Sequence, residues 1–430
     1  MSERYPNKSL NTIYNFFWLG ILLYVASYVV AQSDKVNFIL INVFQIIGLL
    51  MFVPAAIFII RPKIDNKYLG FLYTIFLIWS LIVVARGVEF SYTSIKQLLF
   101  RPKSGLFVYL VPLALLFPRD KIFLKKIFDV IIIMGILYII ISLIFLKDLL
   151  ISHNEAKSRE MLEHFSQYLS FPAGFILLTY TYHSNKRKLF ALFIVVFTFL
   201  LAVLRARRGL MFITFSSLFF AYLVYQYVNR VKIINTILSA FLIVIVSVVA
   251  LKIYDANRTS TFSLITERIG HQTRSEVEEY FYMDLKPKDW IIGKGLEGEY
   301  FCPGVVEGDR ISIYRTVIET GFLQIILNGG IISLGLMLLI MVPALFKGLF
   351  YSKNLMSKAA AIWIILFLLY SYPGTPSMFS MSYILTWISI GICYSAEFRM
   401  IPEDEMTEMI GNNKMLLSED LSGLDIIEQF

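Results

Sequence analysis

Long apolar runs separated by short polar turns make up most of this chain. We count about twelve runs close to the length that a helix needs to cross the hydrocarbon core of a membrane. The first run is too long for the core of a signal peptide and predicts an uncleaved first span. The runs at 105–117 and 359–372 are short for a span. The predicted spans lie near 11–31, 37–60, 69–85, 105–117, 127–146, 165–182, 189–204, 209–228, 233–252, 317–346, 359–372 and 377–395.

One long polar interval interrupts the apolar pattern. It runs over residues 253–318 and carries several arginines, one histidine and several carboxylates. A membrane protein that keeps one large charged loop on one side is expected to work there. We therefore divide the chain into nine spans over 1–252, an extracytoplasmic loop over 253–318 that bears the active site, three spans over 319–395 and an acidic cytoplasmic tail over 396–430.

Composition agrees with an all-α polytopic membrane protein. Hydrophobic residues make up 57% of the 430 residues and charged residues only 16%, which is outside the range of soluble domains. The net charge of +8 does not require nucleic acid, because lysine and arginine gather in cytoplasmic turns and bind lipid phosphate. The only cysteines, Cys302 and Cys393, are predicted at opposite membrane faces. We expect neither a disulfide nor a metal site from their spacing.

The basic turns predict the orientation of the chain. If the N-terminus is cytoplasmic, every cytoplasmic turn is basic, as the positive-inside rule requires. An even number of spans then returns the C-terminus to the same side. The large loop falls outside, together with basic sites at Arg86, 96–103, Arg159 and 205–208. The cytoplasmic turns are 61–67, 119–126, 186–188, 230–232 and 347–358.

The outer site at 205–208 holds three arginines in four residues, Arg205, Arg207 and Arg208. Such a cluster on the outer side is contrary to the positive-inside rule, so we expect it to have a functional role. Guanidinium groups present a planar fork of donors that suits phosphate oxygens. The cluster could bind the pyrophosphate of a lipid carrier. The alternative is that the arginines reach ordinary lipid headgroups.

Within the large loop, residues 263–280 predict an amphipathic helix that carries Arg268, His271 and Arg274. His271 could act as a general base near neutral pH, although a single surface histidine is as often a bystander. The glycine-rich stretch at 293–298 has no strand and helix around it to support a nucleotide fingerprint. We interpret it as a tight turn over the site.

Glu319 stands at the outer boundary of the tenth predicted span. On a helix Arg315 and Glu319 share a face, so they could form a simple ion pair. Alternatively, Glu319 could remove a proton from an attacking sugar hydroxyl. Gln324 and Asn328 on the same helix suit hydrogen bonding within a bundle. The turn at 372–376, rich in proline and glycine, is interpreted as structural.

Three segments in the same order resemble the O-antigen polymerase and O-antigen ligase superfamily. Residues 203–211 resemble the family's Ser-Arg-Gly stretch, with Arg208 on its arginine and Arg207 in place of its serine. Arg274 with the downstream Gly-Lys-Gly at 293–295 resembles the arginine and Gly-x-Gly of the large outer loop. Residues 319–335 resemble the segment that re-enters the membrane.

The third segment departs from the ligases. Many relatives open it with a His-Asn pair whose histidine is the proposed base, whereas this chain has Glu319 and Thr320. The departure favours a polymerase over a ligase and moves the base to Glu319, with His271 as the second candidate.

The resemblance implies a GT-C-like glycosyltransferase of the bacterial cytoplasmic membrane. It would join oligosaccharide repeat units carried on undecaprenyl pyrophosphate into O-antigen or capsule, with inversion and without metal or other cofactor. A chain-length regulator is a possible protein partner, and nucleic acid is not expected. The residues expected at the pyrophosphate are Arg205, Arg207, Arg208, Arg274 and Arg310. Those expected at other parts of the substrate are Arg159, Arg268, Arg315 and Asp309.

Three other functions are compatible with the sequence. A ligase would transfer finished polysaccharide to another acceptor. A flippase for lipid-linked oligosaccharide also has about twelve spans, but transporters place charges and broken helices near the bilayer midplane. Most spans of this chain lack such residues, and the charges collect in outer loops, which favours an enzyme. A sensor or scaffold would need no buried arginines.

Overall fold

The computed structural model describes residues 7–33, 35–88, 91–151, 155–230, 252, 256, 273–303 and 313–411. Helices dominate these residues, and seven are long and apolar enough to cross a membrane. The chain is therefore an all-α membrane protein. The seven are α1 (Asn7–Ala31), α2 (Phe38–Ile59), α3 (Lys67–Ala85), α6 (Lys121–Ile144), α10 (Asn185–Leu204), α11 (Arg208–Val228) and α16 (Gly321–Phe350).

Three shorter apolar segments complete the bundle among the described residues. α17 (Leu355–Tyr370) and α18 (Met381–Tyr394) correspond to the last two predicted spans. The short run predicted at 105–117 is α5 (Leu106–Leu110) continued by the 3-10 helix η1 (Val111–Leu116). The predicted span at 233–252 falls almost wholly outside the described residues, and the total of twelve stays a prediction.

The predicted span at 165–182 is not a continuous helix. The chain passes from α8 (Glu155–Phe165) through a π-helical turn, η2 (Ser166–Ser170), to α9 (Ala173–Leu178) and the 3-10 helix η3 (Tyr180–Tyr182). Pro172 has no N–H to continue the ladder. The Ser170 and Thr179 hydroxyls donate to backbone carbonyls four residues earlier, at 3.1 and 2.7 Å. Proline and such hydroxyl contacts are recognised causes of helix irregularity.

The remaining described elements are short and lie outside the long spans. α4 (Tyr92–Phe100) and α7 (Leu146–Ile151) are connectors. The large loop contributes α14 (Thr273–Asp284), α15 (Pro287–Ile292) and an antiparallel pair, β1 (Tyr300–Phe301) with β2 (Tyr314–Arg315). The amphipathic helix predicted over 263–280 is thus described only from residue 273. α19 (Ala396–Met400) and α20 (Glu403–Ile410) follow the last span.

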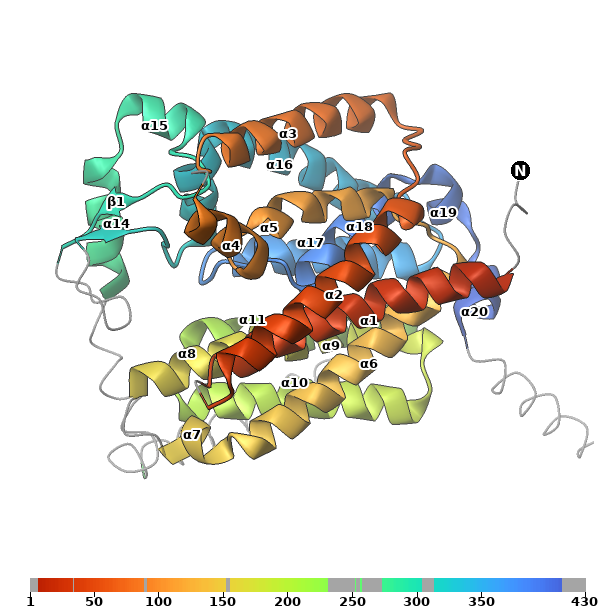
Figure 1. Cartoon of the computed structure of the whole chain (residues 1–430). Coiled ribbons are helices and arrows are strands. Elements are labelled where there is room, and N and C mark those ends of the chain that lie inside the picture. The colour runs from red at the N-terminus through yellow and green to blue at the C-terminus, as the bar shows by residue number, and fades with distance from the viewer. Residues whose placement is uncertain are drawn as a thin grey trace, which may run out of the picture.

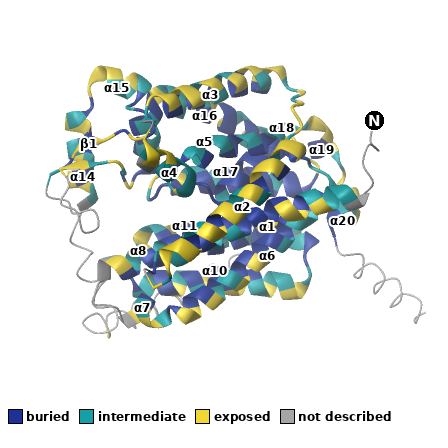
Figure 2. Cartoon of the chain, viewed as in Figure 1, coloured by how far each residue is buried: buried dark blue, intermediate teal, exposed yellow. Residues whose placement is uncertain are grey.

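Two glycines allow α1 and α2 to pack closely against each other. A Cβ on Gly48 would lie 2.7 Å from the Gly20 carbonyl oxygen, and one on Gly20 would lie 2.8 Å from the Gly48 carbonyl oxygen. Small residues permit this backbone approach, which drives helix association in lipid. The opposite face of α2 is apolar and exposed, with Phe58 at 74% and Ile39 at 71% exposure, as suits a lipid-facing surface (Figure 2).

The polar turns sort to two ends of the bundle. At one end Arg61 pairs with Asp120 at 3.8 Å, and α19 and α20 lie nearby (Figure 1). α14, α15 and β1 lie at the other end, where Arg274 donates to the Pro373 carbonyl. The turns predicted to be cytoplasmic thus group apart from those predicted to be external. Which group faces the cytoplasm stays a prediction.

Candidate functional site

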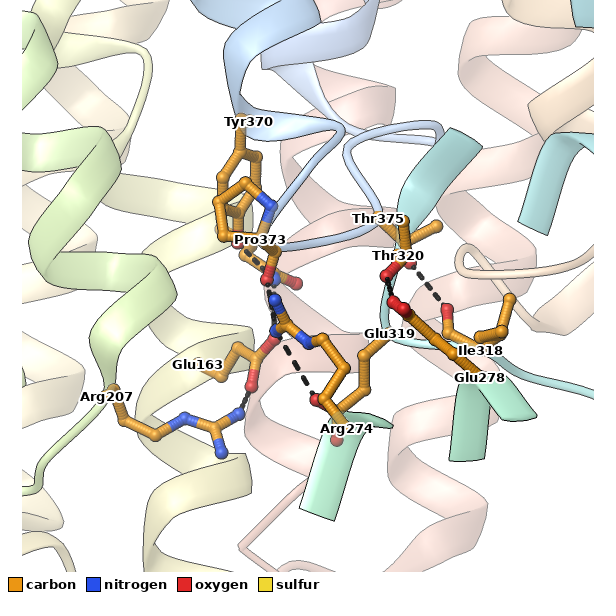
Figure 3. Close-up of polar contacts among 11 residues, drawn as sticks. Glu163, Arg207, Arg274, Glu278, Ile318, Glu319, Thr320, Tyr370, Pro373 and Thr375 are labelled. Carbon is orange, nitrogen blue, oxygen red and sulfur yellow. Dashed lines mark hydrogen bonds and ion pairs between the residues drawn. The ribbon is translucent and has the colours of Figure 1, made fainter. Parts of the chain in front are cut away.

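Four charged side chains from distant parts of the sequence gather at the end of the bundle that holds α14 (Figure 3). Glu163 comes from α8 and Arg207 from the corner between α10 and α11. Arg274 comes from α14, and Glu319 lies two residues before the start of α16. The pairs are Arg207 with Glu163, and Arg274 with Glu319 at 3.4 Å.

The backbone at Ala206 separates the three clustered arginines. Ala206 has φ +51°, a left-handed conformation that a residue with a Cβ rarely adopts outside constrained sites. The turn sends Arg205 inward and leaves Arg208 exposed as the first residue of α11. Arg207, between them, reaches Glu163 and is about a quarter exposed.

Arg205 holds the fold together at this corner. Its side chain is buried, and its guanidinium donates to the Leu149 carbonyl and to the Ser158 hydroxyl. These contacts join the end of α10 to α7 and α8. Burying a guanidinium without such partners would cost several kcal/mol. Arg205 was predicted to bind pyrophosphate, but its donors are directed into the protein, and we leave it out of the site proposed below.

α14 is fixed to the entrance of α16 by two side chains on one face. Arg274 reaches Glu319 and also donates to the Pro373 carbonyl at 3.0 Å. Glu278, one turn further along, accepts a hydrogen bond from the Thr320 hydroxyl. Residues four apart share a helix face. Glu319 itself remains 58% exposed, so its carboxylate is accessible to a substrate.

The predicted helical pair of Arg315 and Glu319 is wrong. Arg315 lies in β2, opposite Tyr300, and α16 begins only at Gly321. The two residues therefore do not share a helix face. The observed partner of Glu319 is Arg274.

The turn at 371–375 supports both the arginine and the start of α16. Gly321 N–H donates to the Gly374 carbonyl at 3.1 Å, and Phe322 N–H donates to the Ser371 carbonyl at 3.2 Å. The Thr375 hydroxyl donates to the Ile318 carbonyl at 3.2 Å. The turn therefore has the structural role that the sequence predicts, and it also presents the Pro373 carbonyl to Arg274.

A neutral relay connects the charged groups to an apolar cavity. The Gln167 amide donates to Glu163 at 2.8 Å and to the Tyr370 hydroxyl at 2.7 Å. Gln167 and Tyr370 line a cavity together with Phe171, Ile213, Trp363 and Phe367. The cavity is thus polar at the end nearest the arginines and mainly apolar elsewhere.

The sequence predicts that the glycine-rich stretch at 293–298 lies over the site. In the structure it does not cover the arginines. It fills a break in α16, where Gly330 has φ +70° and ψ −177°. The Leu327 and Asn328 carbonyls near the break accept hydrogen bonds from Lys294 N–H at 2.7 Å and Gly295 N–H at 2.9 Å. The stretch therefore supplies partners for carbonyls that the interrupted helix leaves unsatisfied.

The structure does not place four of the predicted site residues. His271, Arg268, Asp309 and Arg310 lie outside the described residues. Arg159 is half-buried on α8 and has a partner of its own. No group of three or more His, Cys, Asp or Glu that could hold a metal occurs in the part of the chain that the structure describes.

Sequence reasoning missed Glu163, Gln167, Glu278 and Tyr370 as members of the site. The spacing of four between Glu163 and Gln167 was a usable signal, because residues four apart on a helix are neighbours. The contacts of Glu163 with Arg207 and of Gln167 with Tyr370 join residues far apart in the sequence, and no local pattern predicts them.

The same end of the bundle therefore presents two accessible arginines, each with a carboxylate, beside a mainly apolar cavity. Comparisons of the chain with protein-family models, with curated proteins and with solved structures found no match.

Proposed function

We propose that the protein is a bacterial surface-polysaccharide polymerase of the cytoplasmic membrane. It would join oligosaccharide repeat units that are carried on undecaprenyl pyrophosphate, with both donor and acceptor bound to lipid. The observation that carries the proposal is the convergence of Arg207 and Arg274 beside an apolar cavity at one end of the bundle. A lipid-linked substrate has a charged pyrophosphate joined to a long apolar tail, so its binding site needs positive charge next to an apolar cavity.

The two arginines would bind the pyrophosphate. Guanidinium groups bind phosphate oxygens in a bidentate manner and remain charged at any ordinary pH. Arg208 is exposed on the next residue of the same corner and could add a third positive charge. As the donor's bond between anomeric carbon and oxygen breaks, negative charge develops on the pyrophosphate, and fixed positive groups stabilise that charge.

The isoprenoid tail would leave the arginines through the apolar cavity. The cavity is bounded by η2, α11, α17 and α18, and aromatic side chains form much of its wall. Burying apolar tail surface there contributes roughly 25 cal/mol per Å². Binding energy from this unreactive part of the substrate can hold the reactive end in position.

Glu319 would be the general base. Its carboxylate would take the proton from an acceptor hydroxyl, whose oxygen attacks the anomeric carbon as the bond to the pyrophosphate oxygen breaks. A single displacement of this kind inverts the anomeric configuration. The exposed carboxylate is held beside Arg274 at 3.4 Å, so the base and a pyrophosphate ligand lie next to each other.

The test is polymerisation by the purified full-length protein. The protein would be incubated with an undecaprenyl-pyrophosphate repeat unit and EDTA, and product length would be read on a gel. We expect a ladder from the wild type that Glu319→Gln and Arg207→Ala lose. Arg187→Ala is the matched control, because Arg187 pairs with Asp129 at the opposite end of the bundle.

Each other outcome points to a different function. A ladder that survives Glu319→Gln refutes the assignment of the base and directs attention to His271. Transfer to an added acceptor without a ladder indicates a ligase. Movement of labelled lipid-linked sugar across a vesicle membrane, without any change in its length, indicates a flippase.

A further inference from the structure

A second cavity, separate from the apolar one, lies beside the break in α16. Its walls come from α3, α5, η1, α16, α18 and the segments at residues 103–104, 317 and 375–377, and it is partly open to solvent. Its polar lining includes Ser80, Lys103, Tyr109, Gln324, Asn328, Ser333 and Thr375. We propose that this polar cavity binds a sugar residue of the substrate through the sugar's hydroxyl groups. The choice of a sugar as ligand rests in part on the proposed function.

The amide side chains of this cavity are held in fixed positions. Gln324 accepts from Ile318 N–H at 2.8 Å and donates to Asn328 at 3.0 Å. Asn328 in turn donates to the Tyr109 hydroxyl at 2.8 Å. Gln324 also donates to the Thr316 carbonyl at 3.2 Å, so both of its N–H groups are used. Asn328 has a second N–H group, and a phenol that accepts a hydrogen bond still has its own O–H to donate. The chain of contacts therefore orients donors along one wall before any ligand arrives.

A second polar contact lies further along the cavity. The Trp79 indole N–H donates to the Ser333 hydroxyl and to the Gly329 carbonyl, both at 3.0 Å. Ser333 lines the cavity, and its hydroxyl proton remains available because the oxygen is the acceptor in this contact. The rings of Phe76 and Tyr383 form apolar parts of the same wall. A sugar ring offers a matching combination of hydroxyl groups and apolar C–H faces.

The chemistry of the wall argues against an alkyl chain and against a cation as the ligand. An alkyl chain would leave the amides and hydroxyls without partners, which costs about 1–3 kcal/mol for each group, and the neighbouring apolar cavity suits it better. None of the residues described as lining this cavity is acidic, so a cation has no counter-charge there. Polar residues within a membrane bundle are costly and mark functional positions.

The two cavities lie on either side of the turn that holds Arg274. Pro376 lines the apolar cavity, whereas Thr375 lines the polar one. Val317, two residues before Glu319, also lines the polar cavity. A substrate could therefore place its lipid tail on one side of this turn and a sugar on the other, with the charged cluster nearby.

The test measures sugar binding directly, without any transfer reaction. Saturation-transfer NMR would be recorded on the full-length protein in nanodiscs with the methyl glycosides of N-acetylglucosamine, galactose, rhamnose and glucuronic acid. We expect saturable binding of at least one neutral glycoside, weakened about tenfold or more by Asn328→Leu. Gln226→Leu is the matched control, since it removes an amide from a residue of α11 that lines neither cavity. Tyr109→Phe removes a single hydroxyl and tests the same wall if Asn328→Leu fails to fold.

Four results would overturn the inference. The first three are the absence of saturable binding for all four glycosides, equal weakening by Gln226→Leu, and wild-type affinity in both cavity variants. Binding of the glucuronide alone would also refute it, because the site would then recognise charge through Lys103 rather than hydroxyl groups. Glu319→Gln should bind the glycoside as the wild type does. Wild-type protein that binds sugar without forming polymer would contradict the proposed function and leave the inference intact.

Discussion

The break in α16 leads us to predict that replacing Gly330 destabilises the protein. Its φ of +70° and ψ of −177° belong to a region that is essentially restricted to glycine, and other residues pay about 1–3 kcal/mol there. A Cβ at this position would lie 2.0 Å from the Ile291 carbonyl oxygen and 2.3 Å from its carbon. Both neighbours are backbone atoms, so rotation of a side chain cannot relieve the clash.

Gly330→Ala should therefore displace the segment that packs on the break. That movement would weaken the hydrogen bonds from Lys294 N–H to Leu327 and from Gly295 N–H to Asn328, each worth about 1 kcal/mol. With the backbone strain, we expect a loss of about 3 kcal/mol or more. Thermal unfolding of the protein in detergent, followed by tryptophan fluorescence at a fixed scan rate, measures the effect.

Gly335 on the same helix is the matched control. A Cβ there meets nothing within 4 Å, and alanine is favoured over glycine in a helix by about 1 kcal/mol. Gly335→Ala should therefore unfold at the same temperature as the wild type or slightly higher. If the unfolding temperature of Gly330→Ala is not below that of Gly335→Ala, the described break in α16 and the role of the 293–298 stretch are refuted.

Three further predictions follow from single contacts. Glu319→Gln should abolish polymer formation, which the gel assay measures. It should change the unfolding temperature little, because the ion pair of Glu319 is exposed and such pairs contribute below about 1 kcal/mol to stability. Arg205→Ala should destabilise by about 3 kcal/mol through loss of a buried, hydrogen-bonded guanidinium, whereas Arg208→Ala should stay within about 0.5 kcal/mol; equal unfolding temperatures would contradict the placement of both. Gly48→Val should separate α1 from α2, since its Cβ would meet the Gly20 carbonyl; a cysteine crosslink between the two helices would form more slowly.

The positions of most long helices could be predicted because one property determines them. A run of about twenty apolar residues both favours a helix and places it in lipid, and the run at 209–228 became α11, Arg208–Val228. α6 begins at Lys121, earlier than its apolar run at 127, because Asp120 caps the first turn by accepting from Phe123 N–H. A cap is polar and therefore lies outside any hydropathy run.

The irregular segment after α8 could not be predicted in the same way. Residues 165–182 are apolar enough to suggest a span, but hydropathy does not report whether each backbone carbonyl keeps its partner. Pro172 and the serine and threonine hydroxyls around it change that hydrogen bonding locally. The resulting turn places Gln167 between Glu163 and Tyr370, so the unpredicted irregularity is also what positions a site residue.

The arginine cluster shows why composition alone does not define a site. Three arginines in four residues predict strong positive charge, but the φ of Ala206 sends one into the protein, one to a carboxylate and one to the surface. The partners of Arg207 and Arg274 lie tens of residues away in the sequence. Contacts of that range depend on how the helices pack, which no local pattern records.

The pairing of each arginine with a carboxylate has a consequence for the proposed reaction. Each of the two arginines is already paired with a glutamate, so a pyrophosphate must displace a carboxylate to be bound. Phosphate oxygens compete well for a guanidinium, and the pair at 3.4 Å between Arg274 and the exposed Glu319 is the more open of the two. Binding of the donor at Arg274 would then release the Glu319 carboxylate. The event that loads the leaving group would thus also free the base, and the base would become available only when a donor is present.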